Sequence, residues 1–357
     1  MSSMHILDDS NVIRQRDPQD ALGFAAQQPA QLAHEFGIER KHFTGKQIDA
    51  VVFAGMGGSS LVAELVRTWP DLNVPFVISK EYRLPDFTNK NTLVICSSYS
   101  GNTEETLETL LEAQQRGSHI AVIAHGGKLA ERARQHGHIL AQLPEVPQPR
   151  TSVFYAYRAV IEILIAANLA DESELHQLSD LVEPLTKTVQ QWLPSVLYAQ
   201  NYAKQLADHM VGKTPIIYGG PLMYPAAYKW KINANENAKN TAWSNFLPEF
   251  NNNEFIGWSS HPVEKPFAVV DLLSSFEHPR VQKRFEVTDR MLSGLRPKSV
   301  NVQAKGDSVL EHLLYLVLLG DFATTYLALL NGVNPTPVDL VEKFKKELGP
   351  YEPPANG

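Results

Sequence analysis

The chain has a single cysteine and no excess of positive charge. Because Cys96 stands alone, a disulfide framework and a cysteine-ligated metal site are both excluded within one chain. Lys and Arg number 32 against 39 Asp and Glu, and the formal net charge of −7 leaves no basic surface for nucleic acid or an acidic membrane. Any anionic ligand must therefore be held by local groups.

Long uninterrupted hydrophobic runs are missing as well. Residues 1–20 contain several Asp and Arg residues and no apolar core, so this segment does not have the pattern of a signal peptide. The longest apolar stretch, around 313–330, contains Gly320, Asp321 and two threonines, which predicts a buried helix and not a membrane span. Together with the unpaired cysteine, these features predict a cytoplasmic protein.

The length and the hydrophobic periodicity predict two α/β lobes, each a mainly parallel sheet covered by helices. A chain of 357 residues exceeds the usual size of one domain, and its composition of 43% hydrophobic and 20% charged residues is ordinary for a globular enzyme. Short β-branched runs alternate with longer amphipathic segments, as in a parallel sheet with crossover helices. The predicted strands are 50–54, 76–79, 92–97, 120–124, 215–218, 267–270 and 299–302.

Helices are predicted between these strands, and prolines indicate where one lobe ends. The helical segments are 61–69, 103–116, one from residue 151 onward, 172–191 and 195–211. Prolines make 143–150 an extended loop at the lobe edge, and Gly219-Gly220-Pro221 repeats the glycine-rich opening of the first lobe, which indicates a divergent duplication. The predicted division is an N-terminal extension 1–44, a first domain 45–170, a helical connection 171–211, a second domain 212–348 and a tail 349–357.

Two loops rich in Gly and Ser follow predicted strands. One is Gly55-Met56-Gly57-Gly58-Ser59-Ser60, and the other runs from Ser97 to Glu105 with Thr103 as a plausible N-cap. Free backbone N–H groups at a helix start favour an anion, and the carboxyl ends of parallel strands meet at one sheet edge. We therefore expect the two loops to converge on a phosphate group.

Three alternatives compete with a phosphate site. Gly and Ser residues are common in turns that follow a strand. For either loop alone, an ordinary turn is about as well supported as a phosphate site. A dinucleotide site is disfavoured because Ser60 stands where the third fingerprint glycine is expected and Glu81 is only loosely placed as a ribose acceptor. A Walker-type loop is disfavoured further, because no Gly-Lys-Ser/Thr follows at the required spacing.

These loops resemble those of the sugar isomerase (SIS) superfamily, and further motifs resemble its bifunctional phosphoglucose/phosphomannose isomerases. The matching segments are Gly57-Gly58-Ser59, Ser98-Tyr99-Ser100-Gly101-Asn102-Thr103-Glu104-Glu105-Thr106, Pro149-Arg150, Asn235-Glu236-Asn237-Ala238-Lys239, Asn253-Glu254-Phe255-Ile256-Gly257-Trp258, Asn334-Pro335-Thr336-Pro337-Val338 and Phe344-Lys345. The resemblance covers about 49–348. It implies two SIS lobes and a homodimer whose active site is completed across subunits.

The resemblance also assigns roles to individual residues. Glu236 is the base that moves a proton between neighbouring carbons, Arg150 stabilises the enediolate charge, and Lys345 takes part in ring opening. The phosphate is held by Gly57, Gly58, Ser59, Ser98, Ser100 and Thr103. The alternatives are a solvated helix carboxylate for Glu236, a structural ion pair for Arg150 and a solvated helix face for Lys345, which lies beside Lys343 and Lys346.

The sequence departs from the family pattern at Asn252, a possible ring-opening position where the family usually has His. An amide cannot act as a general acid near neutrality. Ring opening must then use Lys345, water or another histidine such as His261, or the substrate is already open-chain. No two histidines have the spacing of a helical metal site with a carboxylate partner, so no metal site is predicted. Cys96 is expected to be a core side chain.

The predicted function is isomerisation of glucose 6-phosphate, mannose 6-phosphate or both to fructose 6-phosphate through a cis-enediolate, without cofactor or metal. The expected partners are the phosphorylated hexose and a second copy of the chain, with no nucleic acid and no membrane. The alternatives are a non-catalytic sugar-phosphate sensor and an isomerase of another phosphorylated sugar. Retention of both Glu236 and Arg150 argues against a sensor, since binding alone requires neither residue.

Overall fold

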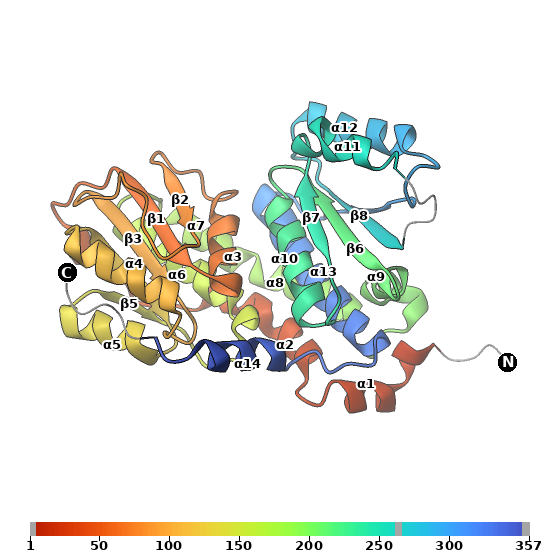
Figure 1. Cartoon of the computed structure of the whole chain (residues 1–357), viewed down its shortest axis with the longest axis horizontal. Helices are drawn as coiled ribbons and strands as arrows, with labels where there is room; N and C mark the ends of the chain where they lie inside the picture. The colour runs from red at the N-terminus through yellow and green to blue at the C-terminus, as the bar shows by residue number, and fades with distance from the viewer. Residues whose placement is uncertain (1–4, 261–265, 352–357) are drawn as a thin grey trace. The chain divides into compact units, whose positions relative to one another are not determined.

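The structure, a computed structural model, describes residues 5–260 and 266–351. Backbone contacts divide the chain into two units, each built on one parallel sheet covered by helices (Figure 1). We call residues 28–182 and 338–357 the first lobe, and residues 1–27 and 183–337 the second lobe. This architecture confirms the predicted fold class. The predicted domain boundaries, which divide the chain into consecutive segments, stay a prediction. Backbone contacts instead group residues 1–27 with the second lobe and residues 338–357 with the first.

The sheet of the first lobe has the strand order β2-β1-β3-β4-β5, with all neighbours parallel. Its strands are β1 (Ala50–Gly55), β2 (Phe76–Ser79), β3 (Thr92–Ser97), β4 (His119–Ala124) and β5 (Ile139–Gln142). The central strands β1 and β3 are buried along their whole length, which is why they read as continuous apolar runs. Strand β5 was not predicted; it is a short edge strand in which Leu140 is partly buried and Gln142 is exposed.

The helices of the first lobe follow its strands. They are α3 (Gly57–Val66), α4 (Glu104–Gln115), α5 (Gly127–His136), α6 (Val153–Ala166), α7 (Ser173–Asp180) and α14 (Asp339–Leu348), with 3-10 turns η2 (Gln28–Ala33), η3 (Arg40–Phe43) and η4 (Pro149–Thr151). The prediction that α3 begins at Leu61 is wrong. The helix begins at Gly57 because the Met56 carbonyl already accepts the N–H groups of Ser59 and Ser60, at 3.0 and 3.3 Å.

The sheet of the second lobe has the order β7-β6-β8-β9, which matches the first four strands of the other sheet. Its strands are β6 (Thr214–Gly219), β7 (Trp243–Phe246), β8 (Phe267–Leu273) and β9 (Val300–Gln303). Thus β6 lies between β7 and β8 as β1 lies between β2 and β3. Strand β7 was not predicted, because its first residue is exposed and its other three are partly buried, so it lacks the alternation of a half-buried strand.

The second lobe contains the remaining helices and turns. They are α1 (Ser10–Arg16), α2 (Ala21–Gln27), α8 (Val182–Val189), α9 (Tyr202–Met210), α10 (Tyr224–Glu236), α11 (Glu254–Gly257), α12 (Pro279–Met291) and α13 (Val309–Leu330), with η1 (Ile6–Asp8), η5 (Gln190–Trp192), η6 (Tyr198–Gln200) and η7 (Glu249–Asn252). The single helix predicted over 172–191 is instead α7 followed by α8. Pro184 has no N–H to continue the ladder of α7, but it is tolerated in the first turn of α8.

Helix α13 forms the core of the second lobe and packs against α10 and α9. Judged by length and composition alone it could cross a membrane, but 94% of its most apolar window is buried within the fold. This burial agrees with the predicted core helix. Polar residues on α13, above all Asp321, are also buried and therefore need partners inside the lobe.

Candidate active site

The β1–α3 junction begins the site of the first lobe. Gly55 ends β1 where a Cβ would lie 2.8 Å from the Ser97 carbonyl oxygen, so only glycine lets the ends of β1 and β3 approach this closely. Gly57 has a φ of +52°, and α3 starts there. The start of α3 at Gly57 and Gly58 directs the positive end of the helix dipole toward this junction.

The β3–α4 junction adds a cluster of hydroxyl groups. The Ser98 Oγ lies 2.8 Å from the Thr103 Oγ1 and 3.5 Å from the Ser100 Oγ, and it accepts the Gly101 N–H at 3.1 Å. Thr103 occupies the predicted N-cap position of α4, but its side chain makes no capping hydrogen bond. Its hydroxyl is turned toward Ser98, so it contributes to the loop and not to the helix end.

The two junctions meet, as the strand order predicts. The Tyr99 N–H donates a hydrogen bond to the Ser59 Oγ at 3.3 Å, which joins the α3 start to the hydroxyl loop. Gly101 has a φ of +69°, and a Cβ there would lie 1.8 Å from the Gly126 carbonyl oxygen, so the loop lies tightly against the β4–α5 connection. We call the hydroxyl groups of Ser59, Ser98, Ser100 and Thr103 with the first turn of α3 the hydroxyl junction.

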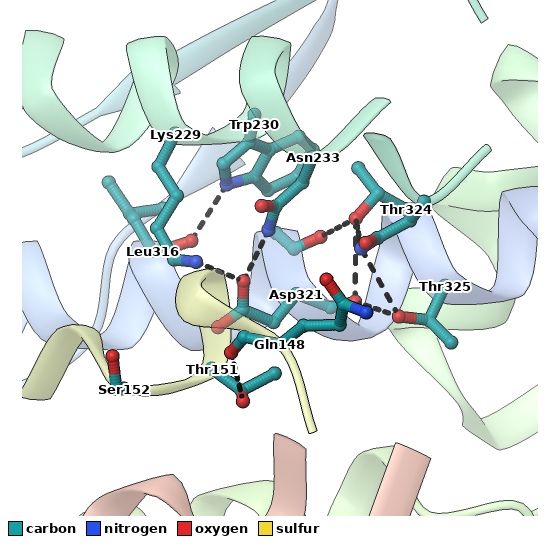
Figure 2. A network of polar contacts seen from close by, with 12 residues as sticks. Gln148, Thr151, Ser152, Lys229, Trp230, Asn233, Leu316, Asp321, Thr324 and Thr325 are labelled. Atoms are coloured by element: carbon teal, nitrogen blue, oxygen red, sulfur yellow. Dashed lines mark hydrogen bonds and ion pairs between the residues drawn. The ribbon is translucent and has the colours of Figure 1, made fainter. Parts of the chain in front are cut away.

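Arg150 lies in η4 of the same lobe and is only 6% exposed. Its Nη1 donates to the Gln148 Oε1 at 3.3 Å. The Thr151 Oγ1 donates to the Gln148 carbonyl at 2.8 Å (Figure 2). A Cβ on Gly58 would lie 3.6 Å from the Arg150 Cα, in ordinary contact. The backbone of η4 therefore packs against the start of α3, which places a buried guanidinium-bearing residue beside the hydroxyl junction.

Glu236 is the last residue of α10 in the second lobe and is partly buried. Lys239, at φ +51°, folds back so that its Nζ donates to the carbonyl oxygen of Glu236 at 2.8 Å. The same Nζ donates to the carbonyls of Asn334 at 2.8 Å and Pro335 at 3.3 Å. The Lys239 ammonium thus binds a carbonyl group at the C-terminal end of α10 and links the motif at 235–239 to the motif at 334–338.

A buried polar network holds α10 against α13 (Figure 2). The Lys229 Nζ pairs with the Asp321 Oδ1 at 2.6 Å, and the side chain of Asn233 donates to the same carboxylate. One turn further, the Asn237 Nδ2 donates to the Thr324 Oγ1 at 3.1 Å. Lys229, Asn233 and Asn237 are four residues apart, so they share one face of the helix. Their bonds set the rotation of α10 and hence the direction of Glu236.

This network was not predicted, although one signal for it is present in the sequence. Asp321 interrupts the longest apolar run of the chain, and a buried carboxylate requires a cationic or hydrogen-bonding partner. The partner Lys229 lies far away in sequence, so only the packing of two helices shows which lysine it is.

The segment containing Asn252 is held by its neighbours. Asn252 is exposed in η7 and its Nδ2 donates to the Pro248 carbonyl at 3.3 Å. Within the adjacent motif, Glu254 accepts from the Tyr218 hydroxyl and, at 2.7 Å, from the Asn245 Nδ2. The motif therefore anchors this segment to β6 and β7. His261, the other histidine considered for ring opening, lies outside the described residues.

Lys345 lies on α14, and its side chain is 62% exposed. Its Nζ pairs with the Glu342 Oε1 at 2.8 Å, three residues earlier on the same helix. This is the arrangement of a solvated helix face, the alternative left open above. Of the predicted site residues, the structure brings together the hydroxyl junction and Arg150 in the first lobe, whereas Lys345 lies apart on α14. In the second lobe Glu236 ends α10 and Asn252 lies in η7 beyond the other end of β7.

Cys96 agrees with its predicted place in the core. Burial raises the pKa of its thiol to about 12, so the thiolate required of a nucleophile or a metal ligand is disfavoured. Within residues 5–260 and 266–351, no three His, Cys, Asp or Glu side chains are grouped so that they could hold a metal ion.

Comparisons with known proteins connect the two lobes to one family. The SIS domain family matches residues 46–167, and the family described as bacterial phospho-glucose isomerase C-terminal SIS domain matches residues 199–348. A bifunctional phosphoglucose/phosphomannose isomerase of Aquifex aeolicus is 34% identical over 301 residues, which are 84% of this chain and 90% of that protein.

Two further likenesses extend the comparison. A D-glucosamine-6-phosphate 4-epimerase of Sulfolobus acidocaldarius is 33% identical over 228 residues, 64% of this chain and 70% of that protein. The crystal structure of a glucose-6-phosphate isomerase like protein from Thermus thermophilus superposes with a TM-score of 0.61 at 18% identity. That superposition covers 96% of this chain and 99% of the other, and it shows that the fold is shared.

Proposed function

This chain belongs to the family of bifunctional phosphoglucose/phosphomannose isomerases with SIS domains, and we propose that it interconverts glucose 6-phosphate and mannose 6-phosphate with fructose 6-phosphate. It is therefore an aldose–ketose isomerase. The observation that carries this conclusion is the 34% identity to such an enzyme over 84% of the chain, since that match includes residues of both lobes. The hydroxyl junction supports it independently, because it offers converging donors for a phosphate group.

In the proposed reaction the hydroxyl junction binds the phosphate. Ser59, Ser98, Ser100 and Thr103 supply hydroxyl donors, and Gly57 and Gly58 let the phosphate approach the backbone of α3 closely. The phosphate is remote from the reacting carbons. Its binding energy is thus available to orient the sugar chain.

Glu236 acts as the base in this proposal. Its carboxylate removes the proton from C2 of the open-chain aldose, the C2–H electrons form the C1–C2 double bond, and O1 becomes an oxyanion. The resulting cis-enediolate accepts the same proton at C1, while the proton on O2 moves to O1 and C2 becomes the carbonyl carbon. The partial burial of Glu236 and its fixed helix end suit a base that must address two adjacent carbons.

Arg150 supplies the positive charge that stabilises the enediolate oxygen. Its guanidinium is buried, where a fixed cation acts more strongly on developing charge than it does in water. Because the enediolate has lost the configuration at C2, return of the proton to C2 from one face gives the glucose epimer and from the other the mannose epimer. Use of both substrates then requires that Glu236 reach C2 from either face.

Ring opening is assigned to Lys345 together with water. The Asn252 amide cannot transfer a proton near neutrality, so it can only position a water molecule or the substrate. We further propose that the enzyme is a cytoplasmic homodimer whose active site is completed across subunits, with Lys345 reaching the substrate in that assembly. The basis for this part is the family resemblance.

The proposal is tested with purified protein in a coupled assay that follows fructose 6-phosphate formation from each aldose phosphate. Glu236→Gln should abolish turnover and retain binding of the sugar phosphates. Glu286→Gln, a change of an exposed carboxylate on α12, is the matched control and should keep wild-type rates. Unchanged turnover in Glu236→Gln would remove this residue as the base.

A second substrate class is favoured by one comparison. The relative named D-glucosamine-6-phosphate 4-epimerase shows that proteins similar to this chain also act on amino sugar phosphates. Glucosamine 6-phosphate should therefore be tested as well, with its product identified by NMR, because an assay that follows fructose 6-phosphate would not detect a 4-epimer. If the wild-type protein is stabilised thermally by all of these sugar phosphates but turns over none, the non-catalytic sensor is the better description.

A further inference from the structure

The second lobe contains a junction built like the one that binds phosphate in the proposed function. Strand β6 pairs with both of its neighbours and passes through Gly219, Gly220 and Pro221 into α10, as β1 passes through Gly55 and Met56 into α3. Strand β8, which neighbours β6 in the sheet, leads into α12 through residues 274–278. This segment is the counterpart of the hydroxyl loop between β3 and α4. The backbone geometry for an anion is thus present twice.

In the second lobe this place is filled by a side chain of the protein. The Glu277 Oε1 accepts the N–H groups of Leu222 at 2.9 Å and Met223 at 3.1 Å, directly before α10. Glu277 is only 4% exposed. A Cβ on Gly220 would lie 2.3 Å from the Glu277 Cδ, so the carboxyl group occupies the space that any side chain at this position would need.

Several bonds hold the loop that presents Glu277. The Gln282 Nε2, from α12, donates to the Glu277 carbonyl at 2.7 Å and to the Ser275 carbonyl at 3.0 Å. The Ser274 Oγ lies 2.8 Å from the Nδ1 of His312 on α13, whose Nε2 lies 3.0 Å from the Gly306 carbonyl oxygen. The carboxyl group is therefore presented from a loop fixed to two helices.

The helix that Glu277 caps is the helix that ends at Glu236. We propose that the Glu277 carboxyl group occupies the second lobe's counterpart of the phosphate junction and thereby positions α10, and with it the base Glu236. This inference rests on the proposed function for the role of Glu236. Glu277 is a positioning residue, since it lies at the opposite end of α10 and acts through the helix. The lobe duplication thus leaves one junction for the substrate and one for an internal carboxyl group.

The protonation state does not abolish this role. Burial raises the pKa of Glu277 to about 7, although its two backbone hydrogen bonds lower it. Both N–H groups are accepted by the Oε1, so a proton on the other oxygen leaves the two bonds in place. The reach of the side chain, and not its charge, should therefore decide the position of α10.

The test compares two conservative variants in the full chain. Glu277→Gln keeps the reach and an acceptor oxygen but loses the charge, whereas Glu277→Asp keeps the charge but is one methylene too short. We expect Glu277→Gln to keep kcat within about threefold of wild type and Glu277→Asp to lower it by about tenfold or more, because small misplacements of a base are costly. The KM for the sugar phosphate should change little in both, since the hydroxyl junction is untouched.

Chemical rescue provides a readout that does not depend on activity. In Glu277→Ala the emptied junction should accept formate, which should raise the melting temperature of the variant and restore part of its kcat, while the same concentration of chloride should do neither. Formate should leave the wild-type protein unchanged. A merely space-filling role for Glu277 would show no preference for a carboxylate.

The outcomes separate this inference from the proposed function. Equal losses of kcat in Glu277→Gln and Glu277→Asp, or wild-type kcat in Glu277→Asp, would overturn the positioning role. If the wild-type enzyme turns over none of the sugar phosphates, the proposed function fails, and formate-specific stabilisation of Glu277→Ala still decides whether the junction holds a carboxyl group. If Glu277→Ala does not fold, the comparison of the Gln and Asp variants decides alone.

Discussion

The two lobes share a strand order but use the start of their first helix in opposite ways. In the first lobe the β1–α3 junction is lined by hydroxyl groups, and Ser59 bonds to the neighbouring loop. In the second lobe the β6–α10 junction is occupied by the buried Glu277. The same backbone therefore leaves a hydroxyl-lined junction in one lobe and holds an internal structural contact in the other, and the difference depends on Glu277 in the β8–α12 loop.

The largest expected effect is a loss of sugar-phosphate affinity when hydroxyl groups are removed from the hydroxyl junction of the first lobe. Replacing both Ser100 and Thr103 by Ala removes two donors to a charged phosphate, each worth about 1.5–3 kcal/mol, so the affinity for the sugar phosphate should fall by about 100-fold or more. Isothermal titration with glucose 6-phosphate measures this. Ser275→Ala, an exposed serine in the corresponding loop of the second lobe, is the control and should bind as wild type. Wild-type affinity in the double variant would remove the phosphate assignment.

The next effect compares one buried ion pair in each lobe. In the second lobe Lys229 and Asp321 join α10 to α13, whereas in the first lobe Arg158 and Glu162 pair at 3.1 Å within α6. Lys229→Met and Arg158→Met each remove a cation that pairs with a buried carboxylate, so each should lower the free energy of unfolding by about 3–5 kcal/mol.

Activity should distinguish these two variants. At a temperature where both are folded, only Lys229→Met should lower kcat, because its pair orients the helix that ends at Glu236. Urea unfolding and steady-state kinetics measure the two quantities. Equal kcat values in the two variants would contradict the role of the α10–α13 network.

A smaller effect concerns pH, because the carboxyl group titrates in a range where the hydroxyl groups of the first lobe do not. Burial raises the pKa of Glu277 from its ordinary value of 4.5 to about 7 in the fold. Its contribution to stability is therefore fully present below about pH 4.5 and is lost as the pH rises through 7.

Relative to Glu277→Gln, the wild-type protein should thus lose on the order of 3 kcal/mol between about pH 4.5 and about pH 8. Urea midpoints of both proteins across this range measure the difference. Ionisable groups that the two proteins share contribute equally to both curves. If the stability difference between the two proteins does not change with pH, the pKa of the Glu277 carboxyl group is not raised.

The smallest effect compares one glycine in each junction. Gly58→Ala places a Cβ 3.6 Å from the Arg150 Cα, in ordinary contact, whereas Gly220→Ala places one 2.3 Å from the Glu277 Cδ. Thermal unfolding should show Gly58→Ala within about 0.5 kcal/mol of wild type and Gly220→Ala destabilised by about 1–2 kcal/mol through displacement of the carboxyl group. In the double variant Gly220→Ala/Glu277→Ala the two costs should be less than additive.

Patterns local in sequence predicted the elements and loops that surround the site. Strands β2 and β3 were predicted to the residue, because short β-branched runs bounded by turn residues are typical of strands. The convergence of Ser59 with the Ser98 loop followed from the rule that parallel strands end at one edge. The start of α3 was missed because Gly and Ser are typical of turns, although here they form the first turn of the helix.

Polar partners distant in sequence were not predictable. Nothing in the sequence around Glu277 distinguishes it from an exposed loop carboxylate, and its partners Leu222 and Met223 are backbone groups more than fifty positions earlier. The same holds for Lys229, whose burial and partner Asp321 nothing in its neighbouring residues indicates. Burial, and not residue type, gives these side chains their function.

By itself the sequence determined the class of fold, the two Gly- and Ser-rich junction loops, and the family, because periodicity and short motifs depend on neighbours along the chain. Only the tertiary structure decided which junction is open and which is filled, and how the helix carrying Glu236 is held at both ends. These outcomes depend on which groups lose water when each sheet packs with its helices. A buried carboxyl group or ammonium is stable only beside a partner, and folding selects that partner from residues far apart in the chain.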